Sequence, residues 1–254
     1  MASFSIPALT VIGAGFLGRA VAEEAQRGGW RVHPVVRSEA SAKQLQPKFP
    51  DVRADDAIAV GFWEKGVPAC DAMVWAMAPS RERPEDDFLV MHRQGAVRAA
   101  GWARRNGVRF VYISSTSVYA EDGGEWVNED APLAKDDPRA MAMAEAEMAC
   151  LRAGGTVLRC AGLYGRERIL RSDPEGPERW LNIIHVEDAA RAVGWGLRQR
   201  SSVYNVCENE PRPRGKPGGT WPEKMRRARR NKKVSNARLR GLGWVCQKRE
   251  EPPP

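Results

Sequence analysis

The sequence predicts an α/β fold, a doubly wound parallel sheet with a small C-terminal substrate lobe. Strand-like apolar runs alternate with helical segments over residues 8–160, and a glycine-rich turn joins the first run to the first helix. This alternation is typical of parallel β-α-β units. It weakens beyond residue 160, where proline, glycine and arginine become frequent. We therefore expect a main domain over 1–160, an interleaved lobe over 161–246 and a disordered tail over 247–254.

The first predicted unit is a buried strand over Ala8–Ile12, followed by the turn Gly13 to Gly18. In such a turn, small residues let the backbone approach a pyrophosphate, and the last glycine lets the next helix pack closely. The next helix is indicated by an apolar side formed by Ala20, Val21, Ala22 and Ala25, and Gly28-Gly29 can end it. Its amino end would point at the phosphates. The predicted phosphate-binding residues are Gly13, Gly15, Phe16, Leu17 and Gly18.

The second predicted strand, Arg31–Val36, ends at Arg37 and Ser38. In dinucleotide-binding folds, an acidic residue at this place accepts a hydrogen bond from the ribose of NAD. A guanidinium would instead bind the 2′-phosphate of NADP. No acidic residue lies between Arg31 and Ser38, so Arg37 and Ser38 favour NADP(H), with NAD(H) as the second choice. The competing interpretation of Arg37 is a solvated charge at the strand end.

The remaining elements follow in order along the chain. Strands are expected over 71–76, 109–113 and 156–159, and helices over 83–105 and 139–152. In the lobe we expect an extended segment over 180–185, a helix over 187–197, a strand over 203–206, and loops over 165–179 and 210–222. Ligands of such sheets bind beyond the carboxyl ends of the strands. The residues expected there, beside the glycine turn, are Ala76, Met77, Ala78, Ser114 and Ser115.

Composition and charge narrow the function classes. The chain has 254 residues, of which 43% are hydrophobic, as in ordinary globular proteins. Its apolar runs are shorter than the roughly 20 residues that span a bilayer, and the first strand leaves no room for a basic leader. We expect a cytoplasmic protein. Five scattered cysteines without a CxxC pair, and three histidines without ligand spacing, predict reduced thiols and no metal site.

The net charge of +8 is concentrated in the basic segment 224–240, which carries nine lysines and arginines. Without these nine charges the chain would be nearly neutral. Such a run could contact phosphates, but aromatic residues only flank it. A solvated helix face or a mobile loop is the favoured interpretation, and nucleic acid is not the expected partner.

Four segments in sequence resemble the extended short-chain dehydrogenase/reductase superfamily, in particular its NAD-dependent epimerase/dehydratase family. They are Gly13 to Gly18, Ser114 to Tyr119, Leu158 to Gly165 and Ile184 to Asp188. Within the family, residues 123–130 and 234–239 are similar to the bacterial YeeZ-like proteins. The resemblance covers the chain up to Trp244 and implies a Rossmann-type sheet.

The resemblance also implies roles for individual residues. Ser115 matches the residue that hydrogen-bonds the reacting oxygen, and Tyr119 lies four positions beyond it. Asp55 matches the aspartate that contacts the adenine amine, while Ala76 to Ala78 would line the cofactor. Strand-end capping for Ser115, packing for Tyr119 and a turn for Asp55 are the alternatives. The implied substrate is a sugar nucleotide or a carbonyl compound, and family analogy suggests a homodimer.

One departure weakens the catalytic part of the resemblance. Family members act through a Tyr-x-x-x-Lys pair, in which the ammonium lowers the pKa of the phenol on the same helix face. The predicted helix 139–152 contains neither residue type, and no tyrosine of the chain has a lysine four positions later. Cys160 also stands where related chains often have proline, and the lobe is short and arginine-rich.

Two functions therefore remain open. The first is an NADP(H)-dependent oxidoreductase or sugar-nucleotide epimerase-like enzyme that uses Ser115 with an unorthodox acid or base. Tyr119 is one candidate for that group, and the others are Glu121, Asp122, Glu129 and His185. The alternative is a dinucleotide-binding redox sensor or regulatory protein without hydride chemistry. The missing pair favours the alternative, and the retained Ser115 favours the enzyme.

Overall fold

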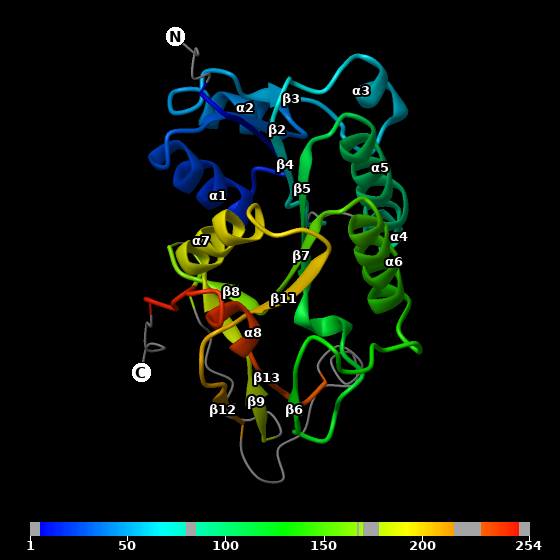
Figure 1. Cartoon of the computed structure of the whole chain (residues 1–254), viewed down its shortest axis with the longest axis vertical. Coiled ribbons are helices and arrows are strands. Elements are labelled where there is room, and N and C mark those ends of the chain that lie inside the picture. Colours follow the sequence, from blue (N-terminus) through cyan, green and yellow to red (C-terminus); the bar gives the residue numbers. More distant parts are fainter. Residues whose placement is uncertain (1–5, 80–84, 167, 170–177, 216–229, 249–254) are drawn as a thin grey trace.

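A seven-stranded parallel sheet forms the centre of the molecule (Figure 1). The structure is a computed structural model that describes residues 6–79, 85–166, 168–169, 178–215 and 230–248. The strand order is β11-β7-β5-β4-β1-β2-β3. The strands are β1 Ala8–Ile12, β2 Arg31–Val36, β3 Arg53–Ala54, β4 Ala72–Trp75, β5 Arg109–Ser115, β7 Thr156–Cys160 and β11 Ser202–Val206. The order reverses between β1 and β4, so the predicted doubly wound fold is confirmed.

Helices cover both faces of this sheet. On one face, α1 (Phe16–Arg27) packs against α7 (Val186–Gly196), and on the other α6 (Pro138–Arg152) packs against α5 (Val97–Arg105) (Figure 1). The shorter helices are α2 Glu39–Leu45, α3 Val60–Glu64, α4 Glu85–Val90, α8 Ala237–Arg240 and the 3₁₀ turn η2 Thr116–Val118. The helix expected over 83–105 is described from Glu85 and has a π-helical middle, η1 Met91–Ala96.

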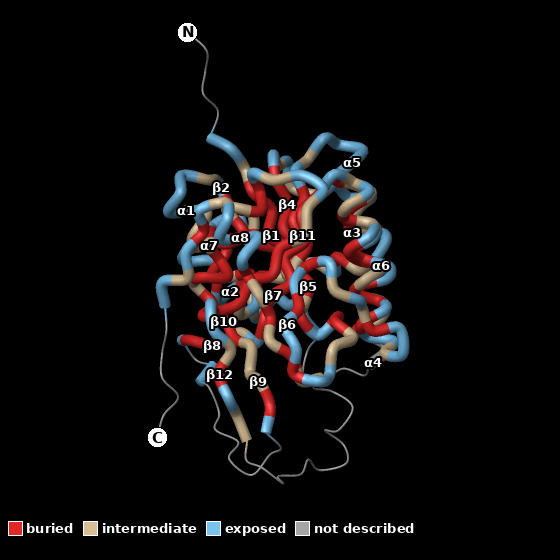
Figure 2. Tube along the Cα trace, turned by 60° about the horizontal axis from the view of Figure 1, so that its bottom comes forward, coloured by how far each residue is buried: buried red, intermediate tan, exposed pale blue. Residues whose placement is uncertain are grey.

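The core follows the strands. All four residues of β4 and all five of β7 are buried, and Figure 2 shows the buried residues gathered on the central strands. Continuous apolar strands of this kind are expected where helices cover both faces of a parallel sheet. Gly95 of η1 helps one helical layer to approach, since a Cβ there would lie 2.7 Å from the Trp75 ring.

Three two-stranded sheets lie beyond the carboxyl ends of the main strands (Figure 1). They pair β8 Gly162–Tyr164 with β10 Ile183–His185, β9 Arg179–Leu181 with β12 Arg212–Arg214, and β6 Trp126–Val127 with β13 Lys233–Val234. The predicted loop 210–222 therefore contains a strand, β12, whose antiparallel partner β9 was too distant in sequence to suggest it. Strand β11, which lies within 161–246, joins the main sheet beside β7.

The basic segment is partly ordered into regular structure. Residues 230–240 include β13 and α8, so this part is not a mobile loop, while 224–229 lie outside the described residues. The predicted tail begins at Gln247, whose backbone N–H donates to Asp188 Oδ1 at 3.0 Å. Residues 249–254 are outside the described part. The five cysteines are free, as predicted. Among the described residues, no helix has the length and apolar character needed to cross a membrane.

Candidate functional site

The glycine turn lies at the point where the strand order reverses. Gly13 adopts φ +91°, and a Cβ there would lie 2.6 Å from the backbone of Met77, which follows β4. At Gly18 a Cβ would lie 2.2 Å from the Gly13 carbonyl oxygen, so only glycine lets α1 pack this closely. A Cβ on Gly15 would meet nothing within 4 Å. The three glycines thus fit a tight turn, an open approach for a pyrophosphate and close helix packing, in that order.

The amino end of α1 faces this open space. Gly15 precedes the helix without a capping side chain, and the first turn contains no acidic residue. The unpaired N–H groups and the helix dipole make such an end attractive to phosphate. Leu17 is buried in the core, whereas Phe16 is partly buried. Leu17 can therefore offer a ligand its backbone but not its side chain.

The predicted ribose-side residues lie at the end of β2. Arg37 is exposed, and its side chain has no hydrogen bond or ion pair within the described part of the chain. The Ser38 hydroxyl caps α2, accepting a hydrogen bond from the Ser41 N–H at 3.2 Å. Position 37 thus presents an uncommitted cation beside an ordered turn.

Asp55 follows β3 and lies beside the end of β2, since its N–H donates to the Val36 carbonyl at 2.8 Å. Its carboxylate accepts from Arg53 Nε at 3.1 Å and from the Asp56 N–H at 2.9 Å. Burial raises the pKa of Asp55, but these donors and the Arg53 charge outweigh it, so the pKa is lowered. Asp55 is therefore an anionic acceptor close to the predicted ribose site.

The residues after β4 line the opposite side of the turn. The Ala76 N–H donates to the Ile12 carbonyl at 2.8 Å, which continues the pairing of β4 with β1. Ala76 and Met77 are partly buried and Ala78 is exposed. The structure therefore brings Ala76 and Met77, two of the three residues predicted after β4, next to the glycine turn.

Ser114 and Ser115, the last two residues of β5, have different environments. The buried Ser114 hydroxyl donates to Glu147 Oε1 of α6 at 2.5 Å. Consecutive strand residues point to opposite faces, so Ser115 points away from α6. Its partly exposed hydroxyl accepts from the N–H of Ser117 at 3.2 Å. Of the two hydroxyls, that of Ser115 is therefore the one available at the carboxyl edge of the sheet.

Tyr119 is fully buried, and its hydroxyl is engaged on both sides. It donates to Asn205 Oδ1 at 2.6 Å and accepts from Arg159 at 3.0 Å. Burial raises the pKa of Tyr119 to about 12, although Arg159 favours the anion. In this conformation the hydroxyl is part of the interior and is not presented to a substrate.

Sequence reasoning missed the centre of this interior network, an ion pair between Glu147 of α6 and Arg159 of β7. The shortest N–O distance is 2.6 Å, and both side chains are about 95% buried. Burial lowers the pKa of Arg159, but the contacts with Glu147 raise it by more than burial lowers it. The guanidinium therefore stays charged. Arg159 also donates to the Glu129 carbonyl oxygen, and the Glu129 carboxylate accepts from the Asn205 N–H. The only sequence signal was a charged residue inside each apolar element.

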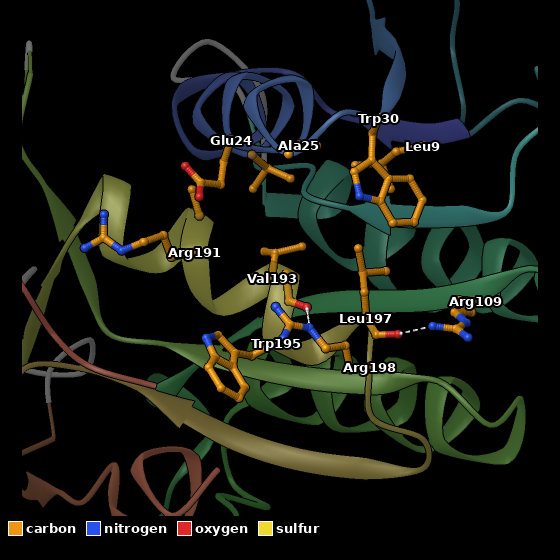
Figure 3. A pocket seen from close by; sticks show the side chains of 14 residues that line it. Leu9, Glu24, Ala25, Trp30, Arg109, Arg191, Val193, Trp195, Leu197 and Arg198 are labelled. Carbon is orange, nitrogen blue, oxygen red and sulfur yellow. Dashed lines mark hydrogen bonds between the residues drawn. The ribbon is translucent and has the colours of Figure 1, made fainter. Parts of the chain in front are cut away.

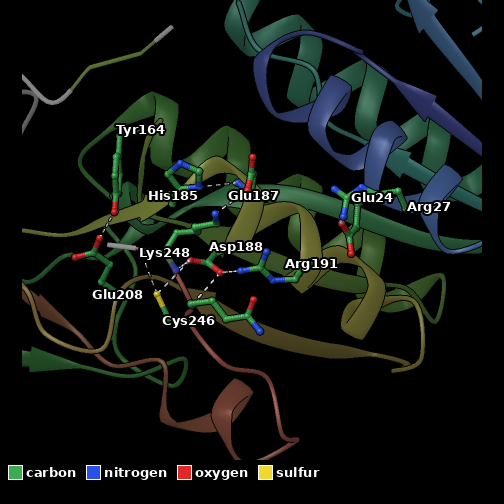
Figure 4. Close-up of polar contacts among 11 residues, drawn as sticks. Glu24, Arg27, Tyr164, His185, Glu187, Asp188, Arg191, Glu208, Cys246 and Lys248 are labelled. Atoms are coloured by element: carbon green, nitrogen blue, oxygen red, sulfur yellow. Dashed lines mark hydrogen bonds and ion pairs between the residues drawn. The ribbon is translucent and has the colours of Figure 1, made fainter. Parts of the chain in front are cut away.

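The other acid or base candidates also have structural partners. The Glu121 carboxylate accepts from the Gly123 N–H, and that of Asp122 from the Asn231 N–H. His185 caps α7 by accepting from the Glu187 N–H at 3.2 Å, and its ring packs edge-on against Tyr164 (Figure 4). All four tyrosines of the chain are buried. On α6, the helix where the family carries its Tyr-x-x-x-Lys pair, the buried face includes Met143 and Glu147 instead.

Two arginines from the segment after β8 approach α1, which the sequence did not indicate. Arg168 lies over the Phe16 ring at 4.4 Å, close to the amino end of α1. Arg166 pairs with Glu23 on the same helix. Burial raises the pKa of Glu23, but Arg166 and Lys48 lower it overall. Arg168 therefore adds a second cation near the glycine turn.

Lys232, in the basic segment, is another unexpected titratable group. It is buried at 5% exposure, and burial together with the nearby Arg230 charge lowers its pKa to about 8. Its carbonyl oxygen accepts from Asn182 Nδ2 at 2.8 Å, which fixes the backbone between the lobe strands. Among so many basic residues, the sequence gave no signal for this one.

The comparisons with known proteins agree with this geometry. The family model "NAD dependent epimerase/dehydratase family" matches residues 9–182, more than half of the chain. A search of the curated proteins found no match.

Similar folds occur among solved structures. A putative NAD-dependent epimerase/dehydratase from Methylobacillus flagellatus is 24% identical, with TM-score 0.71 over 95% of this chain and 93% of that one. WbmG from Bordetella bronchiseptica, in complex with NAD, is 14% identical, with TM-score 0.80 over 98% and 92%. The Thermus thermophilus UDP-glucose 4-epimerase, in complex with NAD, is 18% identical, with TM-score 0.74 over 94% of each chain.

The YeeZ-like subgroup stays a prediction, as do the individual site residues. The glycine turn at the switch point, the parallel sheet and the matched family model together establish the wider relationship. The chain belongs to the NAD-dependent epimerase/dehydratase family.

Proposed function

We propose that this protein binds NADP(H) and acts on a small carbonyl compound or sugar nucleotide, with Ser115 at the reacting oxygen. The observation that carries the proposal is the combination of an open glycine turn with an uncommitted Arg37 at the end of β2. The proposed cofactor-binding set also includes the backbone after β4, the carboxylate of Asp55, the hydroxyl of Ser38, and the backbones of Leu17 and Ser114.

Arg37 supports the choice of NADP(H) over NAD(H). A 2′-phosphate carries about two negative charges, and a guanidinium offers it paired, charge-assisted donors. Asp55 lies nearby, but Arg53 already neutralises its carboxylate. Solved neighbours such as WbmG are described in complex with NAD. The preference for NADP(H) therefore rests on this chain's own residue 37.

Ser115 supports the catalytic part of the proposal. The nicotinamide supplies or accepts a hydride when the cofactor is bound. Ser115 would donate its hydroxyl hydrogen to the substrate oxygen and hold it in place. This contribution positions the oxygen and stabilises developing negative charge. A proton donor must come from another group, and we keep Tyr119 as a candidate that has to leave its buried bonds to act.

A second candidate function is a dinucleotide-dependent sensor or regulator without turnover. The specific observation that favours it is the burial of all four tyrosine side chains, together with the use of α6 for the Glu147 ion pair. With the Tyr119 pKa near 12, its hydroxyl is a weak acid held in the interior. The proposal therefore separates cofactor binding from catalysis.

Titration with NADPH and NADH, followed by nucleotide fluorescence, tests the cofactor assignment. We expect NADPH to bind at least tenfold more tightly, and Arg37→Ala to remove most of this difference while leaving NADH affinity unchanged. Arg31→Ala, at the exposed start of the same strand, is the matched control. Equal affinity of the native protein for both cofactors would refute the NADP(H) preference.

Absorbance at 340 nm over a panel of carbonyl compounds and sugar nucleotides tests turnover. The enzyme proposal requires an active substrate whose turnover falls at least tenfold in Ser115→Ala, with NADPH binding retained. An activity that Ser115→Ala leaves intact would refute the role of Ser115. Tight NADPH binding without turnover over the panel would favour the regulatory function.

A further inference from the structure

A cavity of about 330 Å³ lies between α1 and α7, at the end of the sheet opposite to the glycine turn (Figure 3). Its floor includes Leu9, near the start of β1, and Arg109, the first residue of β5, lies at its edge. The glycine turn follows the other end of β1. The cavity is therefore separate from the candidate dinucleotide site, although α1 contributes to both.

The inner surface of this cavity is apolar. Leu9, Val21, Val193 and Leu197 form the core behind it, and the partly buried Ala25, Trp30 and Trp195 supply its accessible apolar surface (Figure 3). Cavities that bind small molecules are mostly apolar and start at about 300 Å³. Its size and surface therefore suit a single flat molecule of one or two rings.

Gly194 keeps the cavity wide. It lies inside α7, where glycine is less favourable than alanine, and a Cβ there would meet nothing within 4 Å. Gly196 in the same helix is different, because a Cβ would already touch Leu158 at 3.4 Å. Packing therefore accounts for Gly196 but not for Gly194, whose missing side chain only enlarges the cavity.

Positive charge gathers at the rim. Arg109 donates to the Leu197 carbonyl at 3.2 Å, and Arg198 donates to the Gly194 carbonyl at 3.2 Å (Figure 3). Each guanidinium has further N–H groups without a hydrogen-bond acceptor in the described part of the chain, and that of Arg198 also stacks over the Trp195 ring at 4.7 Å. Two full charges exceed the roughly half negative charge of a helix carboxyl end. The other charged rim residues are paired, Glu24 with Arg27 and Arg191 with Asp188.

We propose that this cavity is a second ligand site, which binds a flat apolar molecule carrying one anionic group, such as an aromatic carboxylate. The rings lie between α1 and α7 against Ala25 and Trp30. The anionic group lies at the rim, beside Arg109 or Arg198, which Figure 3 shows on either side of Leu197. This inference does not depend on the identity of the dinucleotide or on catalysis.

Calorimetric titration of the full chain with 2-naphthoate tests the proposal, with 2-naphthalenemethanol as the neutral counterpart. We expect saturable binding of 2-naphthoate at one site, at least tenfold tighter than the neutral compound. Gly194→Leu should weaken binding at least tenfold by filling the cavity. Gly61→Leu is the matched control, because Gly61 lies in the helix α3, away from the cavity, with nothing within 4 Å of a Cβ.

Further variants keep the test decisive if Gly194→Leu does not fold. Gly194→Ala should weaken binding severalfold, and joint replacement of Arg109 and Arg198 by Gln should remove the preference for the anion. Saturating NADPH should not displace 2-naphthoate. Absence of saturable binding, equal affinity for the neutral compound, displacement by NADPH, or folded Gly194 variants that bind normally would each overturn the proposal.

Discussion

The two halves of the candidate site use their polar residues in opposite ways. Around the glycine turn, Gly15 borders open space and Arg37 has no partner among the described residues. At the end of β5, Ser114 and Tyr119 are instead bonded into the interior. Groups already paired within the fold must break those bonds before they act on a ligand. The binding half, around the glycine turn, thus has polar groups free for a ligand. In the reaction half, at the end of β5, most polar groups are bonded within the fold and stabilise it.

The largest effect is expected where the reaction half is most buried. Glu147→Gln leaves the Arg159 charge without its partner, which costs about 3–5 kcal/mol for a buried ion pair. Urea unfolding measures this loss. Glu145→Gln is the control on the same helix, because its exposed pair with Arg93 contributes about 1 kcal/mol or less. Equal losses for the two variants would contradict the structural role of Glu147.

A pH effect should come from His92, which lies beneath α6 and bonds to the Tyr112 hydroxyl at 2.7 Å. Burial, together with the Arg139 charge, lowers the pKa of His92 to about 4. Between pH 6.5 and 4 the unfolded chain therefore binds a proton that the folded chain excludes. The free energy of unfolding should decrease by about 3 kcal/mol as the pH is lowered through this range. Urea unfolding across this range measures the slope, and His92→Gln should remove most of it. An unchanged slope would place the titrating group elsewhere.

In the binding half, the glycines should separate fold from ligand binding. Gly18→Ala places a methyl group against the Gly13 carbonyl and should cost about 1–3 kcal/mol of stability. Gly15→Ala has room in the structure, so it should leave unfolding unchanged while weakening NADPH binding at least tenfold. Thermal unfolding and nucleotide titration of both variants measure the two effects. Normal NADPH affinity in Gly15→Ala would show that the phosphates do not approach this residue.

The smallest effect concerns the cap of α2. Ser38→Ala removes the acceptor for the Ser41 N–H and should cost about 1 kcal/mol. Ser41→Ala keeps that N–H and loses only the hydroxyl, so it should cost less. Urea unfolding compares the two variants. A larger loss in Ser41→Ala would mean that Ser38 does not cap the helix.

The extent to which the sequence predicts the structure follows the same division. Strands β1 and β2 were predicted with their observed bounds, and the helix between them with its end before Gly28-Gly29, because neighbouring residues determine strand, turn and helix. The bond between Tyr119 and Asn205 joins residues 86 positions apart, so no local pattern indicates it. The lobe strands have only two or three residues, too few for an alternating pattern. The candidate binding residues were therefore accessible from sequence, and the burial of Tyr119 was not.

The adjacent serines at the end of β5 also bear on how this edge tolerates mutation. A slip of one residue toward the start of the strand would place Ser115 against Glu147 and Thr116 at the former place of Ser115. Because serine and threonine both carry a hydroxyl, a hydroxyl would remain at both places after that slip. Tyr112 would not, since its ring would leave His92 for the opposite face. Selection against insertions in this strand would therefore act through the tyrosine, while the run of hydroxyl side chains buffers the edge.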